Sequence, residues 1–413
     1  MVGAVIMAMG LSPVLSGVRA QPVHPEARYH LIDLSRDMPS GFNTPTPITV
    51  NDGGEVAGEV YSGSAPSTPI AGYPRQIVLR HSFFRSAGPS SSVGHVFIYD
   101  NGRFTVLKPP PGAAQTFIAG LNDAGSLAVV TCDANQCNRY FVVHPFSGTF
   151  VWTRLTGPGA GSLGGIAANG DVTGALPAPS RPHFDLPVVW KAGRAGSYSR
   201  AWLLGTESGD TKAYIPDAIW SHGGKDIEGG VENVVNFYPE GHAVLWGPKL
   251  ATDRGYIGSQ TMALGGSSSV ALAAVGCPLP LPGACGPNCP VDPVVYHVSI
   301  SSAGTPKVSD KAVLASPPKN QPHCGVSPYD VTLDPGGEPV TVGQASMLVA
   351  KRDVPRALVW FGTRVVALNA IAGAPKTDLQ SANAINDHGC IAGTGTIAGR
   401  TNRAFLLEPV GGW

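Results

Sequence analysis

The chain has 413 residues and a formal net charge of zero, with charged residues at 14% and hydrophobic residues at 43%. The hydrophobic content excludes a disordered chain, and the balanced charge argues against electrostatic capture of nucleic acid or anionic lipid. The 53 glycines and 38 prolines, combined with few charges, are typical of many short strands joined by tight turns. We therefore expect an all-β protein.

Residues 1–20 have the pattern of a signal peptide. The stretch is apolar from Val2 to about Val18, and Val18 and Ala20 occupy positions −3 and −1 of a cut after Ala20. Glycine and proline inside this short apolar run argue against a membrane anchor, and no later segment reaches the length of a membrane span. We expect a secreted or periplasmic protein whose mature chain, residues 21–413, is a single domain.

An internal repeat runs through the mature chain and is clearest at residues 381–409. This stretch has an apolar strand, an Asn-Asp-x-Gly turn, a second strand, a polar loop and a third strand. Asn386 and Asp387 suit the turn because their side chains can bond their own backbone, and Gly389 accepts a positive φ. Similar units begin near residues 48, 118, 164, 216, 261 and 329. An Asp-Asn-Gly hairpin signal at 100–102 adds a fourth strand to its unit.

Four short antiparallel strands, repeated about seven times, are the sequence form of a β-propeller. The last unit ends after its third strand, whereas residues 28–35 (RYHLIDLS) form a strand with no unit before it. We predict that this N-terminal strand completes the last blade, because ring closure removes the exposed edges of an open array.

The start of the third strand carries a further recurring signal, His or Arg followed by two apolar residues. Together with the Asn-Asp turn upstream, this signal resembles the HAF-repeat extracellular proteins. The resemblance implies a secreted, propeller-like protein, and the family brings no established catalytic residues to this chain. The matching tripeptides are His95-Val96-Phe97, His242-Ala243-Val244, Arg356-Ala357-Leu358 and Arg403-Ala404-Phe405.

The loops between second and third strands predict where function lies. In a propeller these loops share one face with the connections between blades, while the Asn-Asp turns lie on the opposite face. Long loops on a rigid scaffold are the usual place for binding. We expect them at residues 61–93, 131–138, 176–186, 277–293 and 345–355.

Five of the seven cysteines fall in these loops, and Cys324 is expected in the connection between blades that follows residues 277–293. In an exported protein, disulfides are the expected state. Cys390, on the second strand of the last unit, is expected to be free and buried. A zinc site at Cys277, Cys285, Cys289 and Cys324, with His323 nearby, lacks the paired CxxC spacing of such sites, and no metal or cofactor is predicted. The disulfide candidates are Cys132, Cys137, Cys277, Cys285, Cys289 and Cys324.

No G-x-S-x-G elbow, H-E-x-x-H pair or P-loop is present. The densest acidic stretch, residues 221–233, offers groups for glycoside hydrolysis or proton abstraction, although a solvated loop explains it more simply. Trp202 and Trp220 are candidates for stacking on a sugar, with core packing as the alternative. The acidic stretch contributes the catalytic candidates His222, Asp226, Glu228 and Glu232.

Three functional hypotheses follow. The first is an exported propeller that binds a carbohydrate or protein partner through its long-loop face, without nucleic acid, metal or cofactor. The second is a glycoside hydrolase or polysaccharide lyase with its site at the mouth of the central channel. The third is a structural repeat protein with no small ligand.

Overall fold

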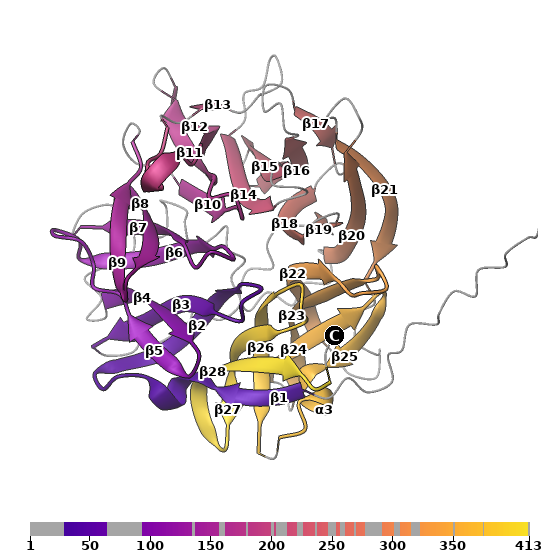
Figure 1. Ribbon diagram of the computed structural model, residues 1–413. Coiled ribbons are helices and arrows are strands. Elements are labelled where there is room, and N and C mark those ends of the chain that lie inside the picture. The colour runs from indigo at the N-terminus through magenta and orange to yellow at the C-terminus, as the bar shows by residue number, and fades with distance from the viewer. Residues whose placement is uncertain are drawn as a thin grey trace, which may run out of the picture.

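The computed structural model describes residues 29–63, 93–133, 137–156, 162–178, 181–199 and 323–411 except 350, 351 and 375. Between residues 200 and 322 it describes the strands together with Leu314. The strands pair into four-stranded antiparallel sheets, and Figure 1 shows these sheets arranged around a ring. The predicted all-β propeller with four-stranded blades is confirmed.

Each blade takes four strands in the order A to D from the inside of the ring outwards. The first blade contains β2 (Phe42–Val50), β3 (Val56–Ser62), β4 (Val93–Asp100) and β5 (Arg103–Val106). The second contains β6 (Gln115–Leu121), β7 (Leu127–Cys132), β8 (Cys137–Phe146) and β9 (Thr149–Arg154). The third contains β10 (Ser162–Ile166), β11 (Val172–Ala178), β12 (Arg181–Trp190) and β13 (Trp202–Leu203).

Two sheets follow whose backbone pairing is described with almost no side chains. They are β14 (Ala213–Trp220), β15 (Asp226–Val235), β16 (Tyr238–Trp246) and β17 (Asp253–Tyr256), and then β18 (Thr261–Ser267), β19 (Val270–Gly276), β20 (Val291–Ile300) and β21 (Pro306–Val313). The next sheet has β22 (His323–Leu333), β23 (Pro339–Val349), β24 (Arg352–Phe361) and β25 (Arg364–Ala367).

The last blade joins the two ends of the described chain. It contains β26 (Asp378–Ile385), β27 (Ile391–Ile397), β28 (Arg400–Pro409) and, as its outermost strand, β1 (Tyr29–Asp33). In the described part of the chain, short helices lie in three connections: η1 (Leu34–Asp37), η2 (Arg194–Gly196) and α3 (Leu368–Ile371). Strands A of neighbouring blades contact one another around the middle of the ring (Figure 1).

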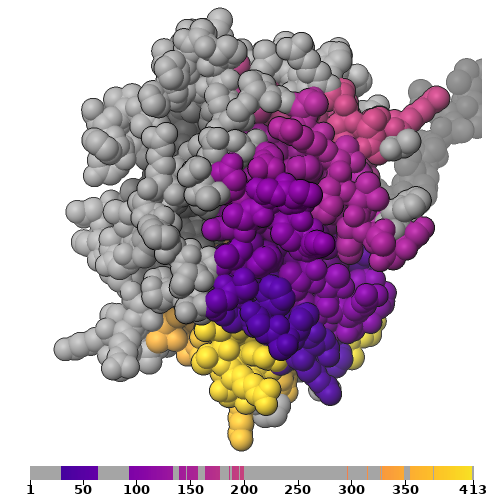
Figure 2. All heavy atoms as spheres, turned by 90° about the vertical axis from the view of Figure 1, so that its left-hand side faces the viewer, coloured from indigo at the N-terminus to yellow at the C-terminus, as the bar shows by residue number. Residues whose placement is uncertain are grey.

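The closure of the ring is fixed by backbone pairing and by a side-chain lock. β1 runs antiparallel to β28, with Tyr29 opposite Pro409 and Asp33 opposite Phe405. The Arg403 guanidinium binds both carboxylate oxygens of Asp33, with Nη2 2.8 Å from one of them. Figure 2 shows the indigo N-terminal strands directly against the yellow C-terminal ones. The prediction that an N-terminal strand completes the last blade is confirmed.

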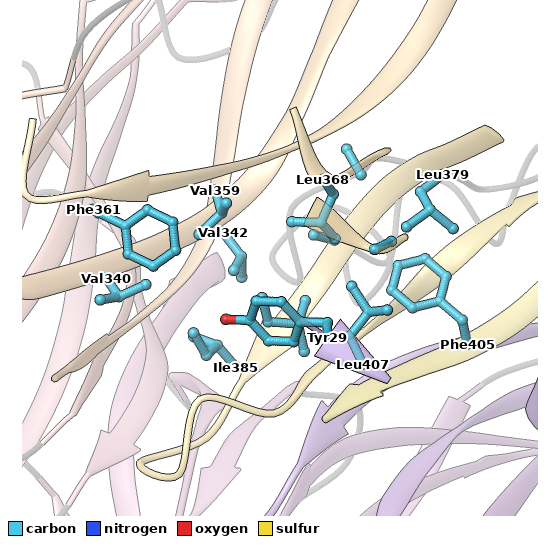
Figure 3. Packing of buried hydrophobic residues seen from close by; sticks show 14 of the residues in the cluster. Tyr29, Val340, Val342, Val359, Phe361, Leu368, Leu379, Ile385, Phe405 and Leu407 are labelled. Atoms are coloured by element: carbon cyan, nitrogen blue, oxygen red, sulfur yellow. The ribbon is translucent and has the colours of Figure 1, made fainter. Parts of the chain in front are cut away.

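Apolar side chains fill the seams between blades. The seam between the blades of β22–β25 and β26–β28 buries an aliphatic and aromatic cluster that includes Leu368, Leu379 and Phe405, each without exposed surface (Figure 3). Tyr29 from β1 packs into the same cluster. The N-terminal strand therefore contributes to the core as well as to the sheet edge.

A glycine on strand B and a phenylalanine on strand C form one packing unit in the first and last blades. Gly58 lies opposite Phe97, and Gly393 lies opposite Phe405. A Cβ at Gly58 would lie 2.2 Å from the Thr46 carbonyl oxygen and 2.8 Å from the Phe97 ring. A Cβ at Gly393 would lie 2.0 Å from a backbone carbonyl oxygen and 2.6 Å from the Phe405 ring. Only glycine leaves room for both strand A and the aromatic ring.

Two of the expected loops are strands. Residues 176–186 and 345–355 continue as paired hairpins, with β11 reaching Ala178 and β23 reaching Val349 before the chain turns back. Pro177 and Pro355 lie within these ladders, and a strand tolerates proline where its nitrogen is not needed for pairing. The connection at 131–138 shortens to residues 133–136, whereas the predicted loops at 61–93 and 277–293 lie largely outside the described residues.

Candidate functional site

The order of the strands gives the propeller two different faces. Because every sheet is antiparallel in the order A to D, all B–C and D–A connections leave one end, here named the loop face. The A–B and C–D turns leave the opposite end, here named the turn face. The long connections 63–92 and 277–290 both belong to the loop face.

The turn face is built from one repeated five-residue turn. In residues 51–55, 122–126, 167–171, 334–338 and 386–390, the first N–H donates to the fifth carbonyl, and the fourth N–H donates to the first carbonyl. The fourth residue is always glycine at a positive φ between 71° and 87°. This left-handed conformation is the one that glycine adopts without strain. The predicted Asn-Asp-x-Gly turns are confirmed as A–B corners.

Buried asparagines in these turns link one blade to the next. The side-chain amide of Asn386 donates to the Asn51 carbonyl at 2.7 Å, and that of Asn51 donates to the Asn122 carbonyl at 3.0 Å. The Asn122 amide then donates to the Ala167 carbonyl at 2.9 Å. Each asparagine also accepts N–H groups of its own turn through Oδ1. These side chains are therefore structural links between blades.

The aspartates of the same turns form a second series of links. The Asp387 N–H donates to Asp52 Oδ1 at 3.0 Å, and the Asp52 N–H donates to Asp123 Oδ1 at 3.1 Å. Burial raises the pKa of Asp52, the N–H of Asp387 lowers it, and the Asp123 carboxylate raises it. The Asn-Asp dipeptides at 386–387 and 51–52 thus each donate two hydrogen bonds to the next blade, one from the asparagine amide and one from the aspartate N–H.

On the loop face, the Arg that begins the third-strand signal anchors neighbouring segments of the chain. Arg403 binds Asp33, and Arg356 binds Asp378 at the start of β26. Arg139 donates to the carbonyls of Pro111 and Gly112, at 3.2 Å and 3.0 Å. In each case the side chain fixes a segment of its own or the following blade. The recurring cation is therefore a loop anchor.

His95 occupies the same position in the first blade and makes a different contact. Its Nε2 lies 3.1 Å from the Ser62 hydroxyl, and its ring meets the edge of Phe42 at 5.4 Å between centroids. Burial lowers the pKa of His95. This polar pair lies where the 63–92 connection leaves β3 and enters β4.

Glu59 and Tyr61 lie on the other face of the same strand, in the seam between the first and second blades. Glu59 is 5% exposed, and the Tyr61 hydroxyl donates to its Oε2 at 3.2 Å. Burial raises the pKa of Glu59 to about 7, while the bonds from Tyr61 and from the Ile118 N–H lower it. A carboxyl group with this pKa exchanges its proton near neutral pH. The sequence carried a signal for it, since Glu59 is the one charge in an otherwise buried strand, VAGEVYS.

The acidic candidates lie along one strand. Residues 226–235 form β15, so the expected solvated loop is wrong for this part, and His222 lies outside the described residues. Asp226 is at the turn-face end, opposite Trp220, and Glu232 is nearer the loop face, opposite Ala213. At about 3.3 Å per residue, Glu228 and Glu232 are separated by roughly 13 Å of backbone. That spacing exceeds the carboxylate separation of glycoside hydrolases, roughly 5–10 Å, whereas Asp226 and Glu228, two residues apart on β15, are separated by roughly 7 Å of backbone, which falls within it.

The tryptophan candidates belong to strands of different blades. Trp202 starts β13, the outermost strand of the third blade, and pairs with Val189. Trp220 ends β14 at the turn face. Their side chains lie outside what the structure describes, so stacking on a sugar and core packing both stay predictions.

The cysteines are placed in part. Cys132 and Cys137 lie directly opposite each other on β7 and β8. Cys324 is on β22, strand A of its blade, and not in the preceding connection as expected. Cys277, Cys285 and Cys289 lie outside the described residues.

Cys390 is free, as predicted, but half-buried rather than buried. It is the last residue of the turn before β27, and its N–H donates to Asn386 Oδ1 at 2.8 Å. Burial raises the pKa of its thiol. Among the described residues, no three His, Cys, Asp or Glu side chains group as metal ligands, and no helix is long and apolar enough to span a membrane.

No family model matches this chain, and no curated protein matches it. Among solved structures, the β-propeller domain of the Trilobed protease from Pyrococcus furiosus is similar, with a TM-score of 0.48 and 9% identity over 94% of this chain and 95% of that chain. Acylaminoacyl peptidase from Pyrococcus horikoshii gives a TM-score of 0.46 and 10% identity, over 91% of this chain and 52% of that chain. A polysaccharide lyase of family PL25, an ulvan lyase, gives 0.42 and 8%, over 89% and 95%.

Proposed function

We propose that the protein is an exported β-propeller of seven blades that binds a carbohydrate or protein partner through its loop face. The observation that supports this proposal is the contrast between the two faces. On the turn face, the described A–B corners are five-residue turns, and three of them donate a buried asparagine amide to the next blade. The long connections 63–92 and 277–290 both start and end at the loop face, at the opposite end of the blades from the asparagine links.

Export is supported by the N-terminal pattern and by the cysteines. We infer that residues 1–20 are a signal peptide and that the protein is secreted or periplasmic. Cys132 and Cys137 are Cα partners on adjacent strands, which suits a cross-strand disulfide in an oxidising compartment. The recurring glycine, phenylalanine and His or Arg positions agree with membership of the HAF-repeat family.

The test replaces residues 63–92 by Asn-Gly, so that Ser62 and Val93, which are Cα partners, are joined by a two-residue hairpin. The last blade has such a turn at the equivalent position, Ala398-Gly399 with φ of 50° and 78°. The shortened chain is therefore expected to fold. Its thermal unfolding and circular dichroism should match those of the full-length protein.

Binding is measured by screening the mature, oxidised protein against a panel of polysaccharides and glycoproteins. We expect the shortened variant to lose at least about tenfold in affinity for any partner found, since about 1.4 kcal/mol of contacts suffices for that loss. Asn101→Gly, in a C–D turn of the turn face, is the matched control and should bind normally. Undiminished binding by the shortened variant would exclude residues 63–92 as the site. Turnover of a polysaccharide by the full-length protein would favour the enzyme hypothesis.

A further inference from the structure

Glu59 is a buried acid held between two blades. It projects from β3 in the first blade, where it lies opposite Val96 of β4 and Thr46 of β2. Its carboxyl group accepts the backbone N–H of Ile118 on β6, the innermost strand of the second blade. The carboxyl therefore ties the two blades together at a point where β6 has a bulge, between Ile118 and Gly120.

The groups around Glu59 leave its charge uncompensated within the part of the chain that is described. β2 and β6 contain no titratable residue. On β4, His95 and Tyr99 face the seam with the last blade, on the other side of the sheet from Glu59. Asp100 lies at the turn-face end of β4. On β3 itself, only the Tyr61 hydroxyl reaches the carboxylate. Asp171 offers a contrast, because this equally buried carboxylate binds the Lys191 ammonium at 2.6 Å.

Both protonation states of the Glu59 carboxyl have hydrogen-bond partners, but they differ in the free energy of burial. A neutral Glu59 can accept the Ile118 N–H through one oxygen and donate its own proton to the Tyr61 hydroxyl. An ionised Glu59 accepts from both donors, yet it holds a full charge in a dry seam. Ionisation therefore favours any opening that brings water to the carboxylate.

The position of Glu59 couples this seam to the loop face. Tyr61 is one residue from the end of β3, where the 63–92 connection starts. Its ring lies 3.5 Å from the position a Cβ of Gly94 would take, and the ring of Phe117 on β6 lies 3.3 Å from the same position. A change in the protonation of Glu59 can therefore alter the packing of β3 and β4, which flank the 63–92 connection, and of β6 in the next blade.

We propose that the Glu59 carboxyl is a proton-dependent latch: when neutral it keeps the seam between the first and second blades closed at the base of the 63–92 connection, and when ionised it loosens that seam. The latch does not depend on any partner. It makes the seam between the first and second blades tighter in mildly acidic surroundings and looser in alkaline ones.

Hydrogen exchange of the whole protein tests the latch. Opening of the seam returns Glu59 to water, where its pKa is near the ordinary 4.5, whereas burial holds the pKa at about 7. By linkage, the opening equilibrium of β3 and β6 should increase roughly 30-fold between pH 5.5 and pH 8.5, after correction for the intrinsic exchange rate. Peptides from β26 and β27 serve as an internal reference in the same sample.

Glu59→Gln keeps the side-chain volume and cannot ionise, so its β3 and β6 peptides should show no such increase. Glu408→Gln, on the half-exposed β28 position, is the matched control and should behave as the wild type. An equal pH dependence in Glu59→Gln and the wild type would overturn the proposal. If Glu59→Gln does not fold, the wild type alone tests the proposal. Hydrogen exchange of β3 and β6 must then rise more steeply with pH than that of β26 and β27, and equal slopes would overturn the proposal.

Discussion

Replacing Asn386 by alanine tests the hydrogen-bonded links between blades at the point where the ring closes. The variant removes the bond from the Asn386 amide to the Asn51 carbonyl, and it removes the oxygen that accepts the N–H groups of Cys390 and of the exposed His388, which water can replace for His388. The Asn51 carbonyl keeps its bond from the Gly54 N–H, so the main loss on that side is the link itself. The Cys390 N–H loses its side-chain acceptor. One net hydrogen bond contributes about 1 kcal/mol and one buried unpaired donor costs about 1–3 kcal/mol, so we expect a loss of about 2–4 kcal/mol.

The unfolding entropy converts this loss into a temperature. At about 2.1 cal/mol/K per residue, a chain of this length has an unfolding entropy near 0.9 kcal/mol/K. Asn386→Ala should therefore lower Tm by about 2–5 °C in calorimetry at a fixed scan rate, which matters because large proteins often unfold irreversibly. Asp123→Asn is the control: it keeps an oxygen for the Asp52 N–H and should shift Tm by less than about 1 °C. A shift below 1 °C for Asn386→Ala, or an equal shift for the control, would refute the assignment of these turns as links.

Two further predictions concern packing and thiols. Gly393→Ala places a Cβ 2.0 Å from a backbone oxygen and should lower Tm by several degrees or prevent folding. Gly53→Ala, whose Cβ would lie 3.3 Å from the Asn51 side chain, should lower Tm less. Equal melting temperatures of the two variants would show that strand A moves away from Gly393 at no cost in stability. In the oxidised native protein, Cys390 should react with a thiol reagent only slowly, because burial raises the pKa of its thiol. Peptide mapping of the same protein should find Cys132 joined to Cys137. An alkylated Cys132 in the unreduced protein would exclude that disulfide.

The local features of the fold could be predicted because they depend on neighbouring residues. The Asn-Asp-x-Gly turns follow from side chains that bond their own backbone and from glycine at a positive φ, as Gly389 shows at 74°. The closing strand followed from a count of strands at the two ends. Both inferences need only the chemistry of a few adjacent positions.

The contacts between blades could not be predicted, because they join residues far apart in the chain. Nothing near Asn386 indicates that its amide reaches Asn51, a residue 335 positions away. Gly58 packs against Phe97 only because the register of β3 and β4 places them opposite each other. Residues 176–186 form paired strands although their prolines favour a loop. Glu59 is a single acidic residue outside any acidic cluster, and its environment comes from burial between two blades that are brought together only by the fold.

The pairing of β1 with β28 also places the first and last described strands side by side. Tyr29 and Pro409 are Cα partners, so the two positions are separated by a single strand spacing of about 5 Å. A linker of a few residues would join them and turn the chain into a covalent circle. New ends placed between Val349 and Arg352, at the tip of a hairpin on the loop face, would leave all pairings within the sheets intact. We therefore expect the ring to tolerate circular permutation, and a reporter domain inserted at that tip would lie on the loop face.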